Sequence, residues 1–568
     1  MKKILILNLS RLGDHLQTSP LIAGLKLKEP DCRITLLGNV KFIGMCEHLP
    51  YIDSLKVFDI QQFERKKGDD PISYLDVYRY LDRLIEELRV EKFDMLINLT
   101  HSRVSGLMGQ ALGIKEALGT YSTSDGYKVI NNPWLIYFNS FIEFRHYNSL
   151  NLVDIYQLGG GVKPSTEGLL INDVEGTRAA SPILDELGIA EGENVIGIAA
   201  GASMVERRWP PKKFAEAADI ISEKRGAKVL IFGGPTEFEL GRELASHMKR
   251  PAINLAGRTS LAELIGLVKR CSMLLTNDTG TMHVAAAVGT PVVALFFVHA
   301  YGAETGPYGE GHIVIEPEID CFPCAHKTTC PHHACFDRVS PLDVSEAAEY
   351  LPSTECGNGF YAPNDSFPTT RVYRTCFDDL GLFDLKPLKK MPMREADIFS
   401  RIYRYMFLKA SYGEIDPACW SGCLKDNFIQ WDKEQRDAWV KKKAALFEGL
   451  AATAEQALKL IEKMGGDYKK GDIEAVKRSA PEIVRFDRKI TNPAFVHEEL
   501  MPIASLFNRG KGNITDMAFE IMLVKTRLLY ASVRDSALSV RRMLEQWGTT
   551  KTGGRRNRIF ADCNNERV

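Results

Sequence analysis

The chain has 568 residues, which is too long for one ordinary domain and predicts about three or four domains. Its net charge of −1 argues against a nucleic-acid partner, and no apolar run is long enough to predict a membrane-spanning helix. The apolar start at residues 4–7 is too short for a signal peptide, so we expect a cytoplasmic protein whose twelve cysteines are not used for disulfides.

The first 175 residues alternate between strand and helix patterns. Short apolar strands are predicted at 4–7, 33–37 and 95–99, and helices at 16–27, 41–48 and 76–89. This alternation predicts a Rossmann-like domain with a parallel sheet over residues 1–175.

A second region of the same kind covers residues 190–345, after a predicted linker at 173–192. Its strands are predicted at 195–199, 228–232, 273–276 and 292–297, and its helices at 212–224, 238–248, 261–269 and 282–288. Two α/β domains in series predict a cleft between them, and such a cleft is the usual place for a ligand.

The pattern changes beyond residue 345. Residues 346–395 are predicted as an irregular linker, because proline and glycine interrupt every apolar pattern. A helical domain is predicted for 396–548, with amphipathic helices at 398–409, 432–464, 472–486 and 514–546, the last of which is long enough to be broken once. The basic end, 549–568, is predicted to be a mobile tail, with a contact to a membrane surface or a partner as the alternative.

The most informative segment is the turn formed by Asp278, Thr279 and Gly280. It follows a buried strand and begins a helix of small residues that Gly289 ends. Backbone N–H groups at such a turn face the crevice where open α/β sheets bind ligands, so a nucleotide site is predicted. The alternative is that Asp278 and Thr279 only cap the helix.

Asp14 occupies a similar strand–turn–helix position after the first strand. A carboxylate there either removes a proton from an incoming hydroxyl group or caps its helix, and the residues alone leave both roles open. Arg11, three residues earlier, is expected to orient Asp14 or to contact a phosphate.

Two further turns carry polar residues at strand ends. Ser203 lies in a small-residue turn before Arg207 and Arg208, which would neutralise a phosphate or simply face solvent. Glu237 follows a Gly-Gly turn and would accept from ribose hydroxyls or only favour the start of its helix. Neither a phosphate-binding loop with Gly-Lys-Ser/Thr nor a strand-borne G-x-G-x-x-G occurs, which argues against a kinase-like NTPase and a standard nicotinamide enzyme.

Four cysteines lie within fifteen residues near the end of the second domain: Cys321, Cys324, Cys330 and Cys335. Their spacing is compatible with a structural zinc or iron–sulfur site, and free thiols are the alternative.

Together these segments resemble glycosyltransferase family 9, the family of ADP-heptose:lipopolysaccharide heptosyltransferases. The resemblance rests on Arg11-Leu12-Gly13-Asp14, on Gly201-Ala202-Ser203 leading to Arg207-Arg208-Trp209-Pro210, and on residues 277–291. It implies a GT-B fold, in which two Rossmann-like domains face a cleft, and a mechanism that needs no metal or cofactor.

The resemblance also implies residue roles. Asp14 matches the general base, Arg207 the cation on the donor diphosphate, and Glu237 the ribose contact. The donor-binding set is completed by Ser203, Arg208, Asp278, Thr279, Gly280 and His283. Arg11 and His101 fall on the acceptor side. The family commonly has lysine where this chain has Arg207, so charge is kept although geometry differs.

The resulting prediction is an inverting, metal-independent glycosyltransferase of lipopolysaccharide biosynthesis. Its donor would be a nucleotide-diphosphate sugar such as ADP-heptose, and its acceptor a cell-envelope glycan or glycolipid. A peripheral position at the inner face of the inner membrane is compatible with this role. The alternatives are a protein-glycosylating transferase that uses the helical domain for its acceptor, a sugar-nucleotide 2-epimerase, and a non-catalytic sugar-nucleotide-binding module.

Overall fold

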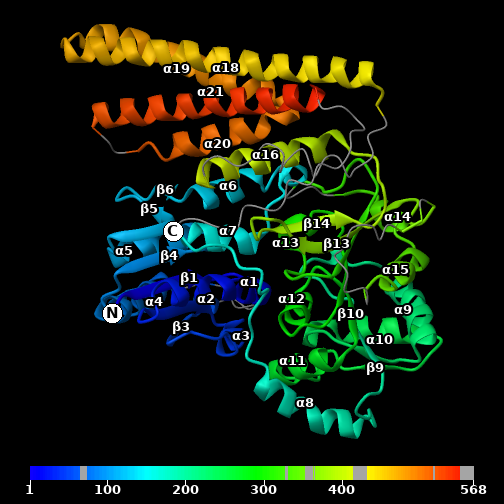
Figure 1. Cartoon of the computed structure of the whole chain (residues 1–568). Coiled ribbons are helices and arrows are strands. Elements are labelled where there is room, and N and C mark those ends of the chain that lie inside the picture. Colours follow the sequence, from blue (N-terminus) through cyan, green and yellow to red (C-terminus); the bar gives the residue numbers. More distant parts are fainter. Residues whose placement is uncertain are drawn as a thin grey trace. The chain divides into compact units, whose positions relative to one another are not determined.

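The computed structural model describes residues 1–63, 73–325, 330–351, 362–363, 365–412, 431–515 and 518–549 (Figure 1). The chain forms two compact units. Unit 1 contains Met1–Met391 together with Ser505–Met522, and unit 2 contains Pro392–Ala504 and the chain from Leu523 onward. Both α/β domains therefore belong to unit 1.

The first domain is built on a six-stranded sheet in the order β3-β2-β1-β4-β5-β6. Its strands are β1 (Lys3–Asn8), β2 (Arg33–Asn39), β3 (Ser54–Phe58), β4 (Met95–Asn98), β5 (Glu116–Ser122) and β6 (Lys128–Ile130). All pairs are parallel except β5 with β6. Its helices are α1 (Leu12–Gln17), α2 (Ser19–Lys28), α3 (Ile43–Glu47), α4 (Tyr74–Val90), α5 (Arg103–Leu112), α6 (Pro133–Phe141) and α7 (Leu152–Gly159).

The helix predicted at 16–27 is in fact two helices that meet at Thr18. Pro20 lies in the first turn of α2 and cannot donate the backbone hydrogen bond that a continuous helix needs. The break matters because it leaves α1 as a short, separate helix that carries Asp14 and Gln17 at the end of β1.

The second domain has an eight-stranded sheet in the order β14-β13-β12-β11-β10-β7-β8-β9. Its strands are β7 (Val195–Ala199), β8 (Lys228–Ile231), β9 (Ala252–Asn254), β10 (Met273–Asn277), β11 (Val292–Leu295), β12 (Ile313–Pro317), β13 (Thr370–Phe377) and β14 (Phe383–Pro387). The six neighbouring strands β12, β11, β10, β7, β8 and β9 are parallel to one another. β13 pairs antiparallel with β12, and β14 pairs antiparallel with β13. The helices are α8 (Val174–Glu186), α9 (Pro211–Arg225), α10 (Phe238–His247), α11 (Leu261–Arg270), α12 (Gly280–Ala287), α13 (Gly302–Thr305), α14 (Cys335–Arg338) and α15 (Pro341–Ala348).

Two predicted linkers contain regular structure. The prediction of an irregular linker at 346–395 is wrong for β13 and β14, which extend the second sheet. Arg371 and Arg374 obscure the apolar alternation of β13, yet both are buried, and Arg371 pairs with Glu318. The segment 173–192 contains helix α8, whose Gly176 lies so close to α11 that a Cβ atom there would be 2.9 Å from the carbonyl oxygen of Ala262.

Unit 2 is helical, as predicted. The helices expected at 398–409, 432–464 and 472–486 are confirmed as α16 (Glu395–Tyr412), α18 (Lys433–Lys469) and α19 (Ile473–Thr491). The last predicted helix is α21 (Phe519–Thr549), which is continuous over its length. A helix that the sequence did not predict, α20 (Met501–Gly512), begins in unit 2 and continues into unit 1 from Ser505.

Aromatic rings and a buried lysine organise the inside of unit 2. Trp439 packs against Trp431, Trp547 and Phe399. Lys443 lies between the carboxylates of Glu395 and Glu499, at 2.7 Å from Glu499. None of the described helices is long and apolar enough to cross a membrane. Of the predicted basic tail, residues 550–568 lie outside the described residues.

Candidate functional site

The carboxyl edges of the two sheets share a cavity of about 530 Å³. Its lining includes ten of the predicted residues: Arg11, Asp14, Ser203, Arg207, Arg208, Glu237, Asp278, Thr279, Gly280 and His283. It also includes Gln17, Phe42, Thr236 and Thr305, which the sequence did not single out. Neither His101 nor the four clustered cysteines line it. The cavity lies where open α/β sheets bind ligands, at the ends of β1, β7, β8 and β10.

Asp14 both caps its helix and faces the cavity. Its Oδ2 accepts from the backbone N–H of Arg11 at 2.9 Å, so the capping role is real and occupies one oxygen. Asn8 fixes this turn, because its buried side-chain amide donates to the carbonyl oxygen of Asp14 and to the hydroxyl oxygen of Thr18. Burial, assisted by the nearby charge of Asp278, raises the pKa of Asp14 above its ordinary value.

The two domains meet where α1 approaches α12. A Cβ atom on Gly13 would lie 2.7 Å from Cδ2 of His283, and one on Gly280 would lie 2.9 Å from the side chain of Leu12. Glycine at these two positions therefore lets the helices touch. His283 is buried, burial lowers its pKa to about 4, and its Nδ1 has no hydrogen-bond partner among the described residues.

Arg207 is held beside the turn at Asp278 by two partners. Its Nη1 contacts Asp278 Oδ2 at 3.1 Å, and its Nε donates to Nε2 of His299 at 3.0 Å. Thr305 donates to the other oxygen of Asp278 at 3.4 Å. Burial lowers the pKa of Arg207, but the guanidinium keeps its charge at any physiological pH. A cation therefore stands fixed beside the start of α12.

Sequence reasoning missed the support behind Arg207. Val298 adopts a φ of 60°, which is strained for a β-branched residue, and the next residue, His299, points its ring at Arg207. Arg145 of the first domain donates to the carbonyl oxygen of His299 at 2.8 Å and pairs with Glu304 at 3.0 Å, with both charged side chains buried. His299 therefore links Arg145 of the first domain to Arg207, which lines the cavity. The only sequence signal for it was a histidine soon after a predicted strand.

Glu237 and Arg208 also line the cavity. Glu237 accepts from the backbone N–H of Gly234 at 2.9 Å and lies 3.9 Å from Arg208. Its carboxylate covers the backbone at Gly201, where a Cβ atom would lie 1.9 Å from Oε1. Arg208 also donates to the carbonyl oxygen of Ala202, which fixes the small-residue turn.

His101 lies outside the cavity, in the loop between β4 and α5. Its Nδ1 contacts Nδ2 of Asn139 at 2.9 Å, and its ring packs on Phe138. The loop is tied to the Asp14 turn because Thr100 accepts from the backbone N–H of Leu9 at 2.8 Å. His101 is therefore on the same sheet edge as Asp14, but one strand away.

None of the four clustered cysteines forms a disulfide. Burial and the other three cysteines raise the pKa of Cys324 to about 11, and burial also raises that of Cys335. Cys330 accepts from the backbone N–H of His333. Among the described residues, which omit 326–329 in this loop, no group of three or more candidate ligands is arranged to hold a metal ion. A metal site here stays a prediction.

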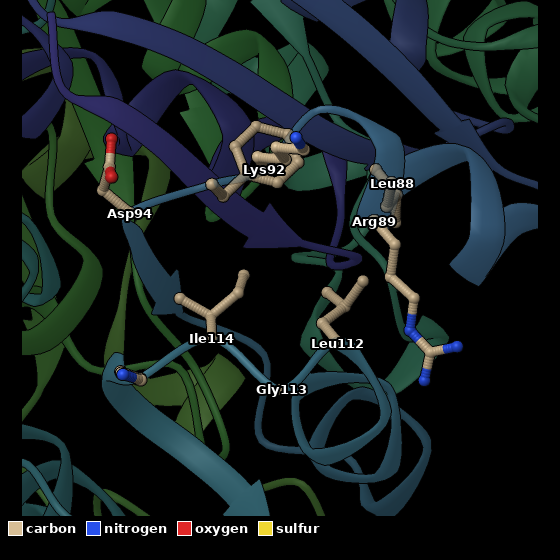
Figure 2. Close-up of a pocket in the computed structure, with 9 residues that line it drawn as sticks. Leu88, Arg89, Lys92, Asp94, Leu112, Gly113 and Ile114 are labelled. Atoms are coloured by element: carbon tan, nitrogen blue, oxygen red, sulfur yellow. The ribbon is translucent and has the colours of Figure 1, made fainter.

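A second hollow, of about 320 Å³, lies at the amino ends of β4 and β5 (Figure 2). Leu88, Leu112 and Ile114 are among its apolar lining, and Arg89, Lys92 and Lys115 are its cations. Arg89 already donates to the carbonyl oxygen of Ala111. Ligands of α/β sheets bind at the opposite ends of the strands, so we do not assign a function to this hollow.

Comparison with known proteins agrees with the geometry of the large cavity. Residues 81–334 match the model of glycosyltransferase family 9 (heptosyltransferase). This part of the chain is therefore similar to the family 9 glycosyltransferases. The match, together with the relatives below, indicates that the protein is a glycosyltransferase.

The individual relatives are distant. The chain is 26% identical over 291 residues to lipopolysaccharide heptosyltransferase 3 of Escherichia coli, covering 50% of this chain and 80% of that protein. It is 32% identical over 171 residues to lipooligosaccharide heptosyltransferase 2 of Campylobacter jejuni, covering 29% of this chain and 52% of that protein. The crystal structure of a family 9 glycosyl transferase from Veillonella parvula aligns with 62% of this chain and 97% of its own, at 25% identity and a TM-score of 0.50.

Proposed function

We propose that the protein transfers a heptose from a nucleotide-diphosphate donor such as ADP-heptose to a cell-envelope glycan, with inversion at the anomeric carbon. The observation that carries this proposal is the position of Asp14. Its carboxylate lines the same cavity as Arg207 and the first turn of α12, so a base and a diphosphate site share one space.

The second domain is proposed to hold the donor. A diphosphate would lie at the N-terminus of α12, where Gly280 and Thr281 present N–H groups and Arg207 supplies a charge. Glu237 would accept from the ribose hydroxyls, because its Oε1 has no backbone partner among the described residues. The diphosphate would displace Asp278 from Arg207, which frees that carboxylate to be held by Thr305.

Asp14 is proposed to take the proton from the acceptor hydroxyl as its oxygen attacks the anomeric carbon. The bond to the diphosphate breaks on the opposite face, and the negative charge that develops there is stabilised by Arg207 and the start of α12. A raised pKa makes the carboxylate of Asp14 a stronger base toward the acceptor hydroxyl. Arg11, on the rim of the cavity, balances the charge of Asp14 before the proton moves.

Incubating the full chain with a panel of nucleotide sugars, with and without deacylated lipopolysaccharide, tests the proposal by mass spectrometry. The expected result is a glycan heavier by one heptose and release of the nucleoside diphosphate, both dependent on acceptor. Consumption of the donor without acceptor would instead indicate a 2-epimerase, and binding without any turnover would indicate a non-catalytic module. Either outcome contradicts the proposal.

A further inference from the structure

The end of α20 and the residue that follows it are hydrogen-bonded to the first α/β domain. The side-chain amide of Asn513 pairs with the edge strand β6 through both of its polar ends. Its Oδ1 accepts from the backbone N–H of Ile130 at 3.1 Å, and its Nδ2 donates to the carbonyl oxygen of Ile130 at 2.6 Å. Four residues earlier, Arg509 donates to the carbonyl oxygen of Asn139 at 3.3 Å. Arg509 is thereby held beside the loop that carries His101.

The hydrogen bonds around His101 determine which ring nitrogen carries its proton. Asn139 Nδ2 donates to the carbonyl oxygen of Leu135 at 2.8 Å, which identifies that end of the amide as the nitrogen. The same nitrogen contacts His101 Nδ1, so Nδ1 accepts and the proton of the neutral ring is on Nε2. Nε2 is buried and has no partner within the described part of the chain.

His101 stays neutral over the physiological range. Burial and the nearby charges of Lys128 and Arg509 lower its pKa to about 3. The Nε2–H group is thus a permanent donor without an acceptor among the described residues, and leaving a buried donor unpaired is unfavourable.

Two cations, Lys128 and Arg509, lie close to His101. Lys128 donates from Nζ to the carbonyl oxygen of His101 at 2.5 Å, and both burial and the charge of Arg509 lower the pKa of Lys128. No carboxylate forms an ion pair with Lys128 or Arg509 among the residues that the structure describes. An anion between them would relieve their repulsion and give His101 its missing acceptor.

We propose that Lys128, Arg509 and the Nε2–H group of His101 form a subsite for a phosphate group carried by the acceptor. The inference rests on the proposed glycosyl transfer, because the subsite is on the same sheet edge as Asp14 and the loop containing Thr100 connects them. Arg509 lies far beyond the family-model match, which ends at residue 334. The C-terminal part of the chain therefore contributes directly to acceptor recognition.

Phosphate binding at His101 can be measured without any turnover. The full chain labelled with ¹⁵N-histidine would be titrated with inorganic phosphate, and the imidazole signals of His101 would be assigned by their loss in His101→Gln. A saturable shift of those signals at millimolar phosphate is expected. Arg509→Gln and Lys128→Gln should each weaken the apparent Kd by about 5- to 20-fold, since each removes one charge from a partly exposed site.

Arg178→Gln is the matched control, because it removes the same charge from an exposed position on α8 and should leave the titration unchanged. Absence of a saturable shift up to roughly 50 mM phosphate, or an equal shift in Arg509→Gln, would overturn the subsite. Failure of the transfer reaction itself would not change this readout, so the two failures are distinguishable.

A kinetic comparison then tests whether the phosphate belongs to the acceptor. Arg509→Gln should raise the KM for a phosphorylated acceptor by about 5- to 20-fold relative to the unaltered chain, and should not raise the KM for the donor. After the acceptor is dephosphorylated enzymatically, the two proteins should have the same acceptor KM. An equal effect on both acceptors would show that Arg509 does not act through the phosphate of the acceptor and would overturn the assignment to the acceptor.

Discussion

Substituting Gly201 by alanine should remove the proposed contact between Glu237 and the donor ribose without unfolding the domain. A Cβ atom at this position would lie 1.9 Å from Oε1 and 2.3 Å from Cδ of Glu237. The clash is with the end of a flexible side chain, so Glu237 can rotate away while the backbone stays in place. Once displaced, Glu237 loses the N–H of Gly234 and no longer reaches the place proposed for the ribose.

The magnitude follows from the bonds that are lost. Hydrogen bonds to a charged group contribute about 1.5–3 kcal/mol each, and partial compensation by water leaves about 2–3 kcal/mol, which is roughly a 30- to 150-fold weaker Kd for the donor. Isothermal titration calorimetry with ADP or ADP-heptose measures this directly. The melting temperature, recorded in parallel, checks that the fold is intact.

Gly234→Ala is a matched control from the same turn. Its Cβ atom would lie 4.0 Å from Oε2 of Glu237, in ordinary contact, and its φ of −74° suits alanine. The backbone N–H of residue 234 can still donate to Glu237, so the affinity for the donor should stay within about threefold of that of the unaltered chain. Unchanged donor affinity in Gly201→Ala would refute the assignment of Glu237 to the ribose.

Three further changes have defined outcomes. Asp14→Asn should raise the melting temperature, because folding raises the pKa of Asp14 and so favours its protonated form. The stability that this proton contributes is present at acidic pH and is lost as the pH rises through the raised pKa. The difference in melting temperature between the variant and the unaltered chain should therefore grow between about pH 4 and neutrality. A constant difference across this pH range would contradict the argument. Arg145→Met should destabilise unit 1 by about 3–5 kcal/mol in urea unfolding, because Glu304 is left buried without its cation, and adding Glu304→Gln should restore part of the loss; strictly additive effects would show that the pair does not interact. Gly13→Ala should force α1 away from His283 and lower the transfer rate at least about tenfold, as measured in the mass-spectrometric assay, and an unaffected rate would mean that the contact between α1 and α12 is dispensable.

The sequence predicted the central parts of the site because each lies in a local pattern. Asp14, Glu237 and Asp278 all follow a buried strand at a turn, and parallel strands bring such turns to one edge. The short apolar strands and their helices were predicted for the same reason, since their periodicity is visible within a few residues.

The missed features depend on contacts between distant segments. Arg145 and Glu304 belong to different α/β domains, and only the folded chain shows that they neutralise each other. The strand β13 was missed because its arginines are buried by pairing and by packing rather than by an apolar pattern. The approach of Arg509 to the first domain depends on Asn513 and β6, a pairing that no local pattern in either segment indicates.

The central claim is that Asp14 removes the proton from the acceptor hydroxyl, and single-turnover transfer by Asp14→Asn tests it most directly. Asparagine keeps the oxygen that accepts from the N–H of Arg11 but is not a base at neutral pH. With donor and acceptor both saturating, the account predicts a transfer rate at least about 100-fold below that of the unaltered chain, with the donor Kd changed less than about threefold. A variant that transfers at more than about a tenth of the unaltered rate would contradict it.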